Sequence, residues 1–276
     1  MDAKRISLDD YELSGGGANG ESYNHKADPN IILKLYFPGK IQQPLDEMEL
    51  ARKVYEMGIP TPEPGDYVVT EDGRYGIRFR RIRNKKSFSR ATGDNPELVG
   101  KYAEEFAGMC VKLHSVHVDT KQFQCVKDRY YRLLVENPFF STSQKDRIAK
   151  FIADAPDTDT AIHGDLQYSN AIFAGTEKYF IDLGDFCYGY NLFDVGMVYL
   201  CCCLSGESFI LETFHMHKPL AIKFWQNFAP AYFGHDRPLS DIEEEIRPYA
   251  GLKTLIVERD TKCPMPEFRA AMSSLL

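Results

Sequence analysis

The chain has 276 residues, which is enough for one large domain or for two lobes that share a core. Its composition, with 43% hydrophobic and 26% charged residues, is that of an ordinary soluble protein, and its net charge of −7 argues against a basic surface that binds nucleic acid. The seven cysteines are odd in number and contain no C-x-x-C pair, so neither a disulfide framework nor a zinc site is indicated. The N-terminus lacks the apolar core of a signal peptide and the apolar run 195–204 is too short to span a bilayer, so we expect a cytoplasmic protein without a membrane partner.

The first eighty or so residues are predicted to be mainly β-strand. A glycine cluster at 14–20 separates two strands, and a strongly apolar strand then carries one lysine. A helix follows that is ended by Gly58 and Pro60, and an Asp-Gly turn joins the last two strands. The expected strands are 7–13, 21–26, 31–36, 67–70 and 75–79, and the expected helix is 45–57.

After a basic connector at 80–86 the pattern becomes helical. Apolar residues recur at helical spacing from Pro96 to about His117. Further helices are expected at about 126–136, 142–154, 192–204, 219–232, 240–257 and 266–275, and short strands near 171–173 and 179–181. The sequence therefore predicts an α+β protein with a small β-rich lobe at 1–82 and a larger helical lobe at 83–276.

The most informative motif is His-Gly-Asp-Leu-Gln-Tyr-Ser-Asn at 163–170, followed by Asp182 at the end of a short apolar run. Phosphoryl transfer requires hard oxygen ligands for Mg²⁺ and a group that orients the attacking hydroxyl. Asp165 and Asn170 have the spacing of the protein-kinase loop H-R-D-x-x-x-x-N, with Gly164 in place of the arginine. Each residue alone could serve a turn or a cap, but the three together favour phosphoryl transfer.

The motif resembles the H-G-D-x-x-x-x-N signature of the aminoglycoside phosphotransferase and choline kinase superfamily. Residues 181–189 are similar to the I-D-x-x-D/E-x-x-x-G pattern of the same superfamily. The resemblance implies a two-lobed protein-kinase-like fold in which Asp165 is the catalytic residue and Asn170 and Asp182 bind Mg²⁺. It also implies ATP as phosphate donor, with GTP as an open alternative, and a small-molecule hydroxyl as acceptor.

The glycine cluster, with Gly15, Gly16, Gly17 and Gly20, fits G-x-G-x-x-G. It leads into polar residues and another strand rather than a helix, which argues against a Rossmann fingerprint, and no Gly-Lys-Ser/Thr follows that would make a P-loop. A hairpin whose backbone N–H groups bind phosphates is favoured over a flexible hairpin without a ligand.

Lys34 lies in the apolar strand 31–36, where alternation places it on the face opposite Leu33 and Leu35. A kinase uses such a lysine to bind the α- and β-phosphates, and a glutamate on the next helix positions it. Glu47 and Glu49 are both candidates, and the spacing to the Gly-Ile-Pro-Thr-Pro segment at 58–62, which resembles a family motif, favours Glu47. The alternative is a solvated lysine beside surface carboxylates.

The connector is the expected adenine contact. By position, Phe79, Arg80, Arg81 and Ile82 are predicted to offer backbone groups to the base, although their basic run could equally be a solvated surface.

Three further residues have expected supporting roles. His163 is interpreted as an anchor of the catalytic loop rather than an acid or base. Asp194 resembles the aspartate that binds the catalytic-loop backbone in kinase-like folds, and as an acid at a helix N-terminus it also has a local reason to be there. Asp185 could approach a metal or a cationic substrate, or lie on a loop surface.

The sequence thus predicts an ATP- and Mg²⁺-dependent phosphotransferase that acts on a small molecule. The net charge of −7 would suit a cationic substrate, and it would equally suit a solvated acidic surface. A protein kinase is disfavoured because the eleven residues between Asp182 and Asp194 leave no room for a long activation segment. The alternative is a non-catalytic nucleotide-binding regulator or scaffold with the same fold. The acceptor, the choice between ATP and GTP, the oligomeric state and any link to antibiotic resistance are not set by the sequence.

Overall fold

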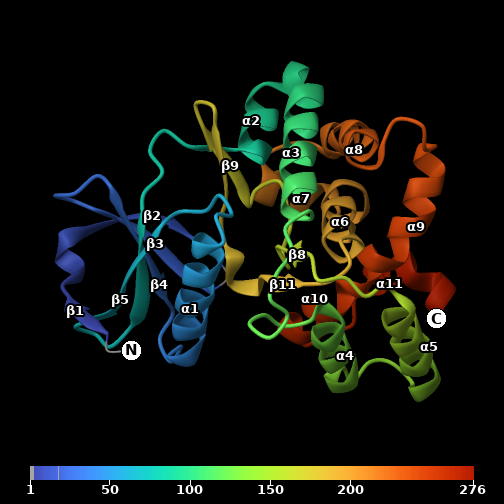
Figure 1. Cartoon of the computed structure of the whole chain (residues 1–276), viewed down its shortest axis with the longest axis horizontal. Coiled ribbons are helices and arrows are strands. Elements are labelled where there is room, and N and C mark those ends of the chain that lie inside the picture. Colours follow the sequence, from blue (N-terminus) through green and yellow to red (C-terminus); the bar gives the residue numbers. More distant parts are fainter. Residues whose placement is uncertain (1–2, 18) are drawn as a thin grey trace. The chain divides into compact units, whose positions relative to one another are not determined.

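The computed structural model describes residues 3–17 and 19–276; Ala18 of the glycine cluster and the first two residues of the N-terminus lie outside this description. The chain forms two compact units (Figure 1). One comprises Met1–Lys86 with Ile172–Gly184, and the other comprises Ser87–Ala171 with Asp185–Leu276.

The first unit is built on a six-stranded sheet of order β1-β5-β6-β4-β3-β2. Strand β1 runs parallel to β5, and the other neighbours are antiparallel. Helix α1 follows β4 and packs against the sheet (Figure 1). The elements are β1 (Lys4–Ile6), β2 (Tyr11–Gly16), β3 (Gly20–His25), β4 (Ile31–Tyr36), α1 (Gln42–Glu56), β5 (Pro64–Thr70) and β6 (Tyr75–Arg80).

Alternate side chains of β4 pack on opposite faces of this sheet. Leu33 and Leu35 pack into one apolar cluster with Ile6, Tyr11 and Val68. The other face carries Tyr36, which packs with Met48 of α1, Tyr67 and Ile77. Lys34 has the same parity as Tyr36, so the strand directs it toward the α1 side of the sheet.

The predicted strand 7–13 is wrong in its first half. A 3-10 turn at Leu8–Asp10 interrupts it, because the Ser7 hydroxyl accepts a hydrogen bond from Asp9 N (3.4 Å) and caps the turn. The chain resumes as β2 only at Tyr11.

The segment Ile172–Gly184 contains most of β9 (Ala171–Ala174) and all of β10 (Glu177–Phe180). These strands form a three-stranded sheet of order β10-β9-β7, with β7 at Lys86–Ser87. Phe180 N donates to Pro60 O (2.8 Å). Residues 172–184 therefore pack with the sheet-containing unit. The predicted boundary at residue 82 had placed them in the helical lobe. That division into functional lobes stays a prediction.

The second unit is mainly helical and has a core rich in aromatic rings. Phe106 of α3 lies 5.5 Å from Phe228 of α8 between ring centroids, and Tyr168 lies 4.9 Å from Phe224. Figure 1 shows α3 beside α8. The helices are α2 (Phe88–Asp94), α3 (Val99–Leu113), α4 (Val126–Glu136), α5 (Thr142–Asp154), α6 (Leu192–Tyr199), α7 (Glu207–Phe214), α8 (Lys218–Phe233), α9 (Leu239–Leu252), α10 (Thr254–Thr261) and α11 (Pro266–Arg269). Strands β8 (Ala161–Ile162) and β11 (Cys187–Tyr188) pair antiparallel.

The helix predictions at 126–136 and 142–154 are confirmed, whereas the single helix predicted at 240–257 is wrong. It breaks at Lys253, which is buried between α9 and α10 and whose N–H donates to Ala250 O (3.1 Å) instead of to the carbonyl four residues back. The helix predicted at 266–275 continues beyond Arg269 only as a 3-10 turn, and α2 and α7 were not predicted.

In the described part of the chain, no single helix has both the length and the apolar character to cross a membrane. One pair of helices, Leu192–Leu204 and Glu207–Phe214, is bent by 116° at the break between them. Together, and by length and composition only, the two helices would meet the requirements for a membrane span.

The glycines of the hairpin between β2 and β3 differ in what surrounds them. A Cβ on Gly20 would lie 2.2 Å from Leu35 O, whereas Gly15 has open space. We predict that Gly20→Ala lowers the free energy of unfolding by about 2 kcal/mol or more, because the strand pair must separate to admit a methyl group. Gly15→Ala should change it by less than about 0.5 kcal/mol. Chemical denaturation of both variants measures this, and equal stabilities would contradict it.

Candidate active site

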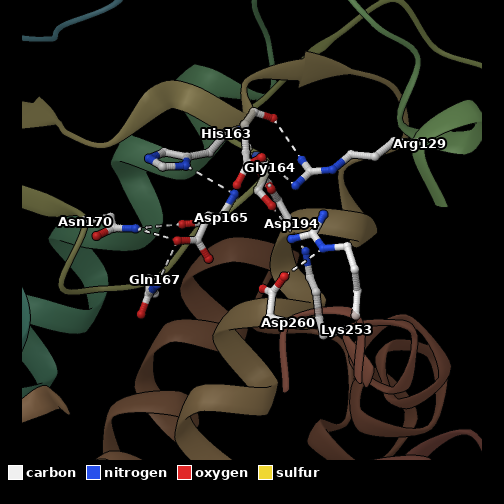
Figure 2. Close-up of polar contacts among 11 residues, drawn as sticks. Arg129, His163, Gly164, Asp165, Gln167, Asn170, Asp194, Lys253 and Asp260 are labelled. Atoms are coloured by element: carbon white, nitrogen blue, oxygen red, sulfur yellow. Dashed lines mark hydrogen bonds and ion pairs between the residues drawn. The ribbon is translucent and has the colours of Figure 1, made fainter. Parts of the chain in front are cut away.

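The catalytic-loop motif follows β8, and its backbone is held by one buried carboxylate (Figure 2). Asp194, in the first turn of α6, accepts hydrogen bonds from His163 N (2.6 Å) and Gly164 N (2.9 Å). Burial alone would raise the pKa of Asp194, but the hydrogen bond from His114 and nearby positive charge keep that pKa below its ordinary value. Asp194 is therefore an anion that fixes the turn leading to Asp165.

On the side away from the loop, His114 and Tyr232 continue the hydrogen bonding of Asp194. His114 Nε2 lies 3.2 Å from Asp194 Oδ2, and its Nδ1 lies 2.7 Å from the Tyr232 hydroxyl. Since an ionised carboxylate only accepts, His114 Nε2 carries a proton and donates a hydrogen bond to Asp194. Asn191 Nδ2 donates to the same hydroxyl oxygen (2.6 Å). His114 thus contacts the support of the loop and not the reacting centre.

Asp165 presents its two carboxylate oxygens differently. Oδ2 accepts from Gln167 Nε2 (2.9 Å) and Asn170 Nδ2 (3.0 Å), and Asn170 Nδ2 also donates to Asp165 O (3.0 Å). Oδ1 accepts no hydrogen bond from any residue that the structure describes. Burial raises the pKa of Asp165, and this effect is opposed by the nearby His163 ring, the Gln167 hydrogen bond and the positive charge of Lys253. The loop therefore orients a basic carboxylate with one oxygen available.

The orientation of Asn170 follows from the same contacts. Both atoms that it meets on Asp165 can only accept, so Asn170 must turn its NH₂ group toward them. Its amide oxygen then points away (Figure 2) and accepts no hydrogen bond from the described residues. A hard oxygen in this position suits Mg²⁺.

Position 164 tolerates no side chain. Gly164 has φ +86°, and a Cβ there would lie 2.0 Å from Asp185 O. Arg129 of α4 holds that carbonyl with Nη1 (3.1 Å) and the Asp185 carboxylate with Nη2 (2.6 Å). Asp185 is thus ion-paired with Arg129, beside the catalytic loop.

Four polar groups meet in the sheet-containing unit. Lys34 Nζ lies 2.7 Å from Glu47 Oε1, 3.0 Å from Glu47 Oε2 and 2.6 Å from Asp182 Oδ1. Tyr36, two residues beyond Lys34 in β4, donates its buried hydroxyl to Glu47 Oε2. Burial alone would lower the pKa of Lys34, but the Asp182 and Glu47 carboxylates raise it, so the lysine stays charged. Glu49 is exposed, and Lys34 pairs with Glu47.

The segment after Asp182 is shaped to fit against Glu47. A Cβ on Gly184 would lie 3.0 Å from Glu47 Oε2. Asp182 itself has a left-handed φ of +61°, and its side chain is 54% exposed. A carboxylate this accessible is a suitable ligand for a hard cation. Asn170 and Asp182 belong to different units, and within residues 3–17 and 19–276 no three His, Cys, Asp or Glu residues gather as a metal-binding group.

The connector offers fewer backbone donors than expected. Arg80 N donates to Glu63 O (2.8 Å) and Arg81 N to Asn30 O (2.7 Å). These two N–H groups are used within the unit, so an adenine contact at these two residues would depend on their carbonyl groups.

Sequence reasoning missed four residues beside the predicted site: Tyr36, Arg129, Tyr232 and Lys253. Tyr36 carried a usable signal, because strand alternation puts it on the face of Lys34. Lys253 lay in the helix predicted at 240–257, and no local pattern distinguishes it from a solvated lysine. Its Nζ lies 3.4 Å from Gly164 O.

The comparisons with known proteins agree with this geometry. Residues 11–220 match the family model described as "Phosphotransferase enzyme family". No curated protein sequence matches the chain significantly. Among solved structures, amicoumacin kinase hAmiN is 13% identical with a TM-score of 0.60, covering 99% of this chain and 88% of that one. A thermostable mutant of aminoglycoside phosphotransferase APH(4)-Ia, in its apo form, is 14% identical with a TM-score of 0.62, covering 96% and 94%.

A choline/ethanolamine kinase family protein from Mesorhizobium loti is 16% identical with a TM-score of 0.53, covering 96% of this chain and 85% of the other. The fold is therefore α+β and two-lobed, as predicted, and of the aminoglycoside phosphotransferase type. The chain belongs to the phosphotransferase enzyme family, and the resemblance seen in its motifs is confirmed.

The role of Asp194 makes stability depend on pH in a defined direction. Its pKa is lower in the folded chain than the value of about 3.9 in the unfolded chain, so its contribution is fully present above about pH 4 and is lost as pH falls through the folded pKa. We predict that Asp194→Asn lowers the free energy of unfolding by about 3 kcal/mol at pH 7, because one loop N–H loses its acceptor.

The deficit of Asp194→Asn relative to the natural chain should shrink as the pH falls below about 4 toward the lowered folded pKa of Asp194, because the unfolded chain takes up the proton first. Denaturation curves between pH 3 and about pH 7 measure it. The exposed Asp146→Asn is the control. A deficit that is constant with pH would rule out the ionised Asp194 as the loop support.

Proposed function

We propose that this phosphotransferase moves the γ-phosphoryl group of a nucleoside triphosphate, with Mg²⁺, to a hydroxyl of a small molecule. The observation that carries the proposal is the state of Asp165. One of its oxygens is fixed by Gln167 and Asn170 and the other accepts no hydrogen bond within the described chain. That is the arrangement a group needs if it is to receive a hydroxyl proton.

In the proposed reaction the acceptor hydroxyl donates a hydrogen bond to Asp165 Oδ1. As the hydroxyl oxygen bonds to the γ-phosphorus, the bond from that phosphorus to the bridging oxygen of the nucleoside diphosphate breaks, and the proton passes to Asp165. Burial, which raises the pKa of this carboxyl, makes it a better proton acceptor.

The phosphates are proposed to bind to Lys34, which Glu47 and Tyr36 hold from the α1 side. The backbone N–H groups of Gly15 and Gly16 would cover them, since these glycines have space around them. The Gly17 N–H donates to Gly20 O (2.9 Å), and Gly20 is explained by strand packing. Mg²⁺ would neutralise phosphate charge, with Asn170 Oδ1 and the Asp182 carboxylate as its protein ligands. Asp182 would then exchange Lys34 for the cation.

The donor nucleotide and the acceptor are the open parts of the proposal. Solved structures of the same fold contain AMP-PNP, Ca²⁺ and amicoumacin, or ADP and hygromycin B. By analogy we propose ATP or GTP as donor, and an aminoglycoside, amino alcohol, sugar or nucleoside as acceptor. A cytoplasmic location and the lack of nucleic-acid and membrane partners stay predictions.

The first test is transfer itself. We predict that the protein with ATP or GTP and Mg²⁺ phosphorylates at least one member of a panel of aminoglycosides, amino alcohols, sugars and nucleosides. Asp165→Asn should lower kcat about 10³-fold with nucleotide affinity unchanged, because the proton acceptor is lost and the phosphate-binding residues are intact. Asp146→Asn is the matched control. Nucleotide binding without transfer to any acceptor would favour the non-catalytic alternative.

The second test concerns the metal. We predict that Mg²⁺ increases the thermal stabilisation of the protein by ATP, and that Asp182→Ala removes this increment because its carboxylate is a proposed metal ligand. Stabilisation by ATP without Mg²⁺ should persist through Lys34. A full Mg²⁺ increment in Asp182→Ala shows that the metal is held elsewhere.

A further inference from the structure

Lys253 has an environment that is unusual for a lysine. Its side chain is 2% exposed, and among residues 3–17 and 19–276 no other lysine or arginine is buried. The ammonium group lies 5.4 Å from the centroid of the Tyr130 ring. It donates a hydrogen bond to a backbone carbonyl, Gly164 O (3.4 Å), and although burial alone would lower its pKa, Tyr130 and Asp194 raise that pKa. Burying a charge with so little direct compensation costs stability, and this cost requires an explanation.

The carbonyl that Lys253 contacts belongs to the peptide bond that carries Asp165. The N–H of that same peptide lies 3.4 Å from His163 Nδ1, and the preceding N–H is held by Asp194. The turn is therefore held by an anion on its N–H groups and by a cation on its carbonyl oxygen (Figure 2). Asp194 and Lys253 attract each other through the buried interior, which offsets part of the cost of burying both.

Position 164 cannot supply this cation itself. Protein-kinase loops carry an arginine directly before the catalytic aspartate. Here the approach of Asp185 O to Gly164 excludes any side chain. The positive charge comes instead from the break between α9 and α10, beyond residues 11–220 that match the family model.

We propose that Lys253 is a positioning residue of the catalytic loop: its buried ammonium group holds the Gly164 carbonyl and thereby fixes the backbone that orients Asp165. This role rests on the proposed phosphotransferase function.

The test compares Lys253→Met with Lys218→Met. Methionine has nearly the length of lysine and no charge, and Lys218 Nζ also donates to a backbone carbonyl, Ser205 O (2.9 Å), in the same unit. We expect Lys253→Met to unfold at a lower temperature than the natural chain, because the buried Asp194 anion loses part of its compensating positive charge. Hydrogen exchange of the loop peptide 161–168 should become about ten-fold faster without any ligand. Lys218→Met should leave this exchange unchanged.

Activity provides the second measurement. With an acceptor found in the panel, Lys253→Met should lower kcat by about 10- to 100-fold while KM for the nucleotide changes less than about two-fold, because misplacement of Asp165 affects only the chemical step. Should Lys253→Met not fold, Lys253→Gln is measured in the same way. If neither folds, Lys253 is a structural residue and the proposal is wrong.

Unchanged loop exchange in Lys253→Met overturns the proposal whatever the activity. Faster exchange with an unchanged kcat overturns it as well. If loop exchange is faster in Lys253→Met but the natural protein transfers phosphate to no acceptor, only the proposed function is refuted. The restraint of the loop by Lys253 is then supported.

Discussion

The catalytic loop depends on a single carboxylate. Asp194 is fully buried, and its two oxygens accept the N–H groups of His163 and Gly164, the two residues before Asp165. An anion buried to this degree is stable only where donors surround it, and here the donors are the loop backbone and the ring of His114. The side chains of this arrangement come from α6, α8 and the residue directly after α3, so the packing of the helical unit and the geometry of the loop are parts of one structure.

The sheet-containing unit also surrounds a charged group with partners, but here the central group is a cation. Lys34 is a cation held between two carboxylates, Glu47 and Asp182, and Tyr36 supplies the donor that fixes Glu47 from the other side. The three ionised groups carry a net charge of −1, which would be balanced by a cation.

The sequence was most informative where spacing and period are local. The strand around Lys34 and the helices at 126–136 and 142–154 follow from alternation and helical periodicity, and the H-G-D-x-x-x-x-N spacing places Asp165 and Asn170 on one loop. Contacts between distant segments left no such signal. Arg129 meets Asp185 across 56 residues and Lys253 meets Gly164 across 89, so neither could be predicted without the fold. The strand predicted at 7–13 failed because a serine hydroxyl competes with the sheet for the backbone.

The close approach of Asp185 to Gly164 has a consequence for regulation. In kinases that are switched on by phosphorylation, a phosphorylated segment is ordered by pairing with arginine side chains. In this chain position 164 is closed to every residue but glycine, and the nearby guanidinium of Arg129 is already bound to Asp185. Lys253 beside Gly164 is buried, so among the described residues near this position the positive charges are already used by internal contacts.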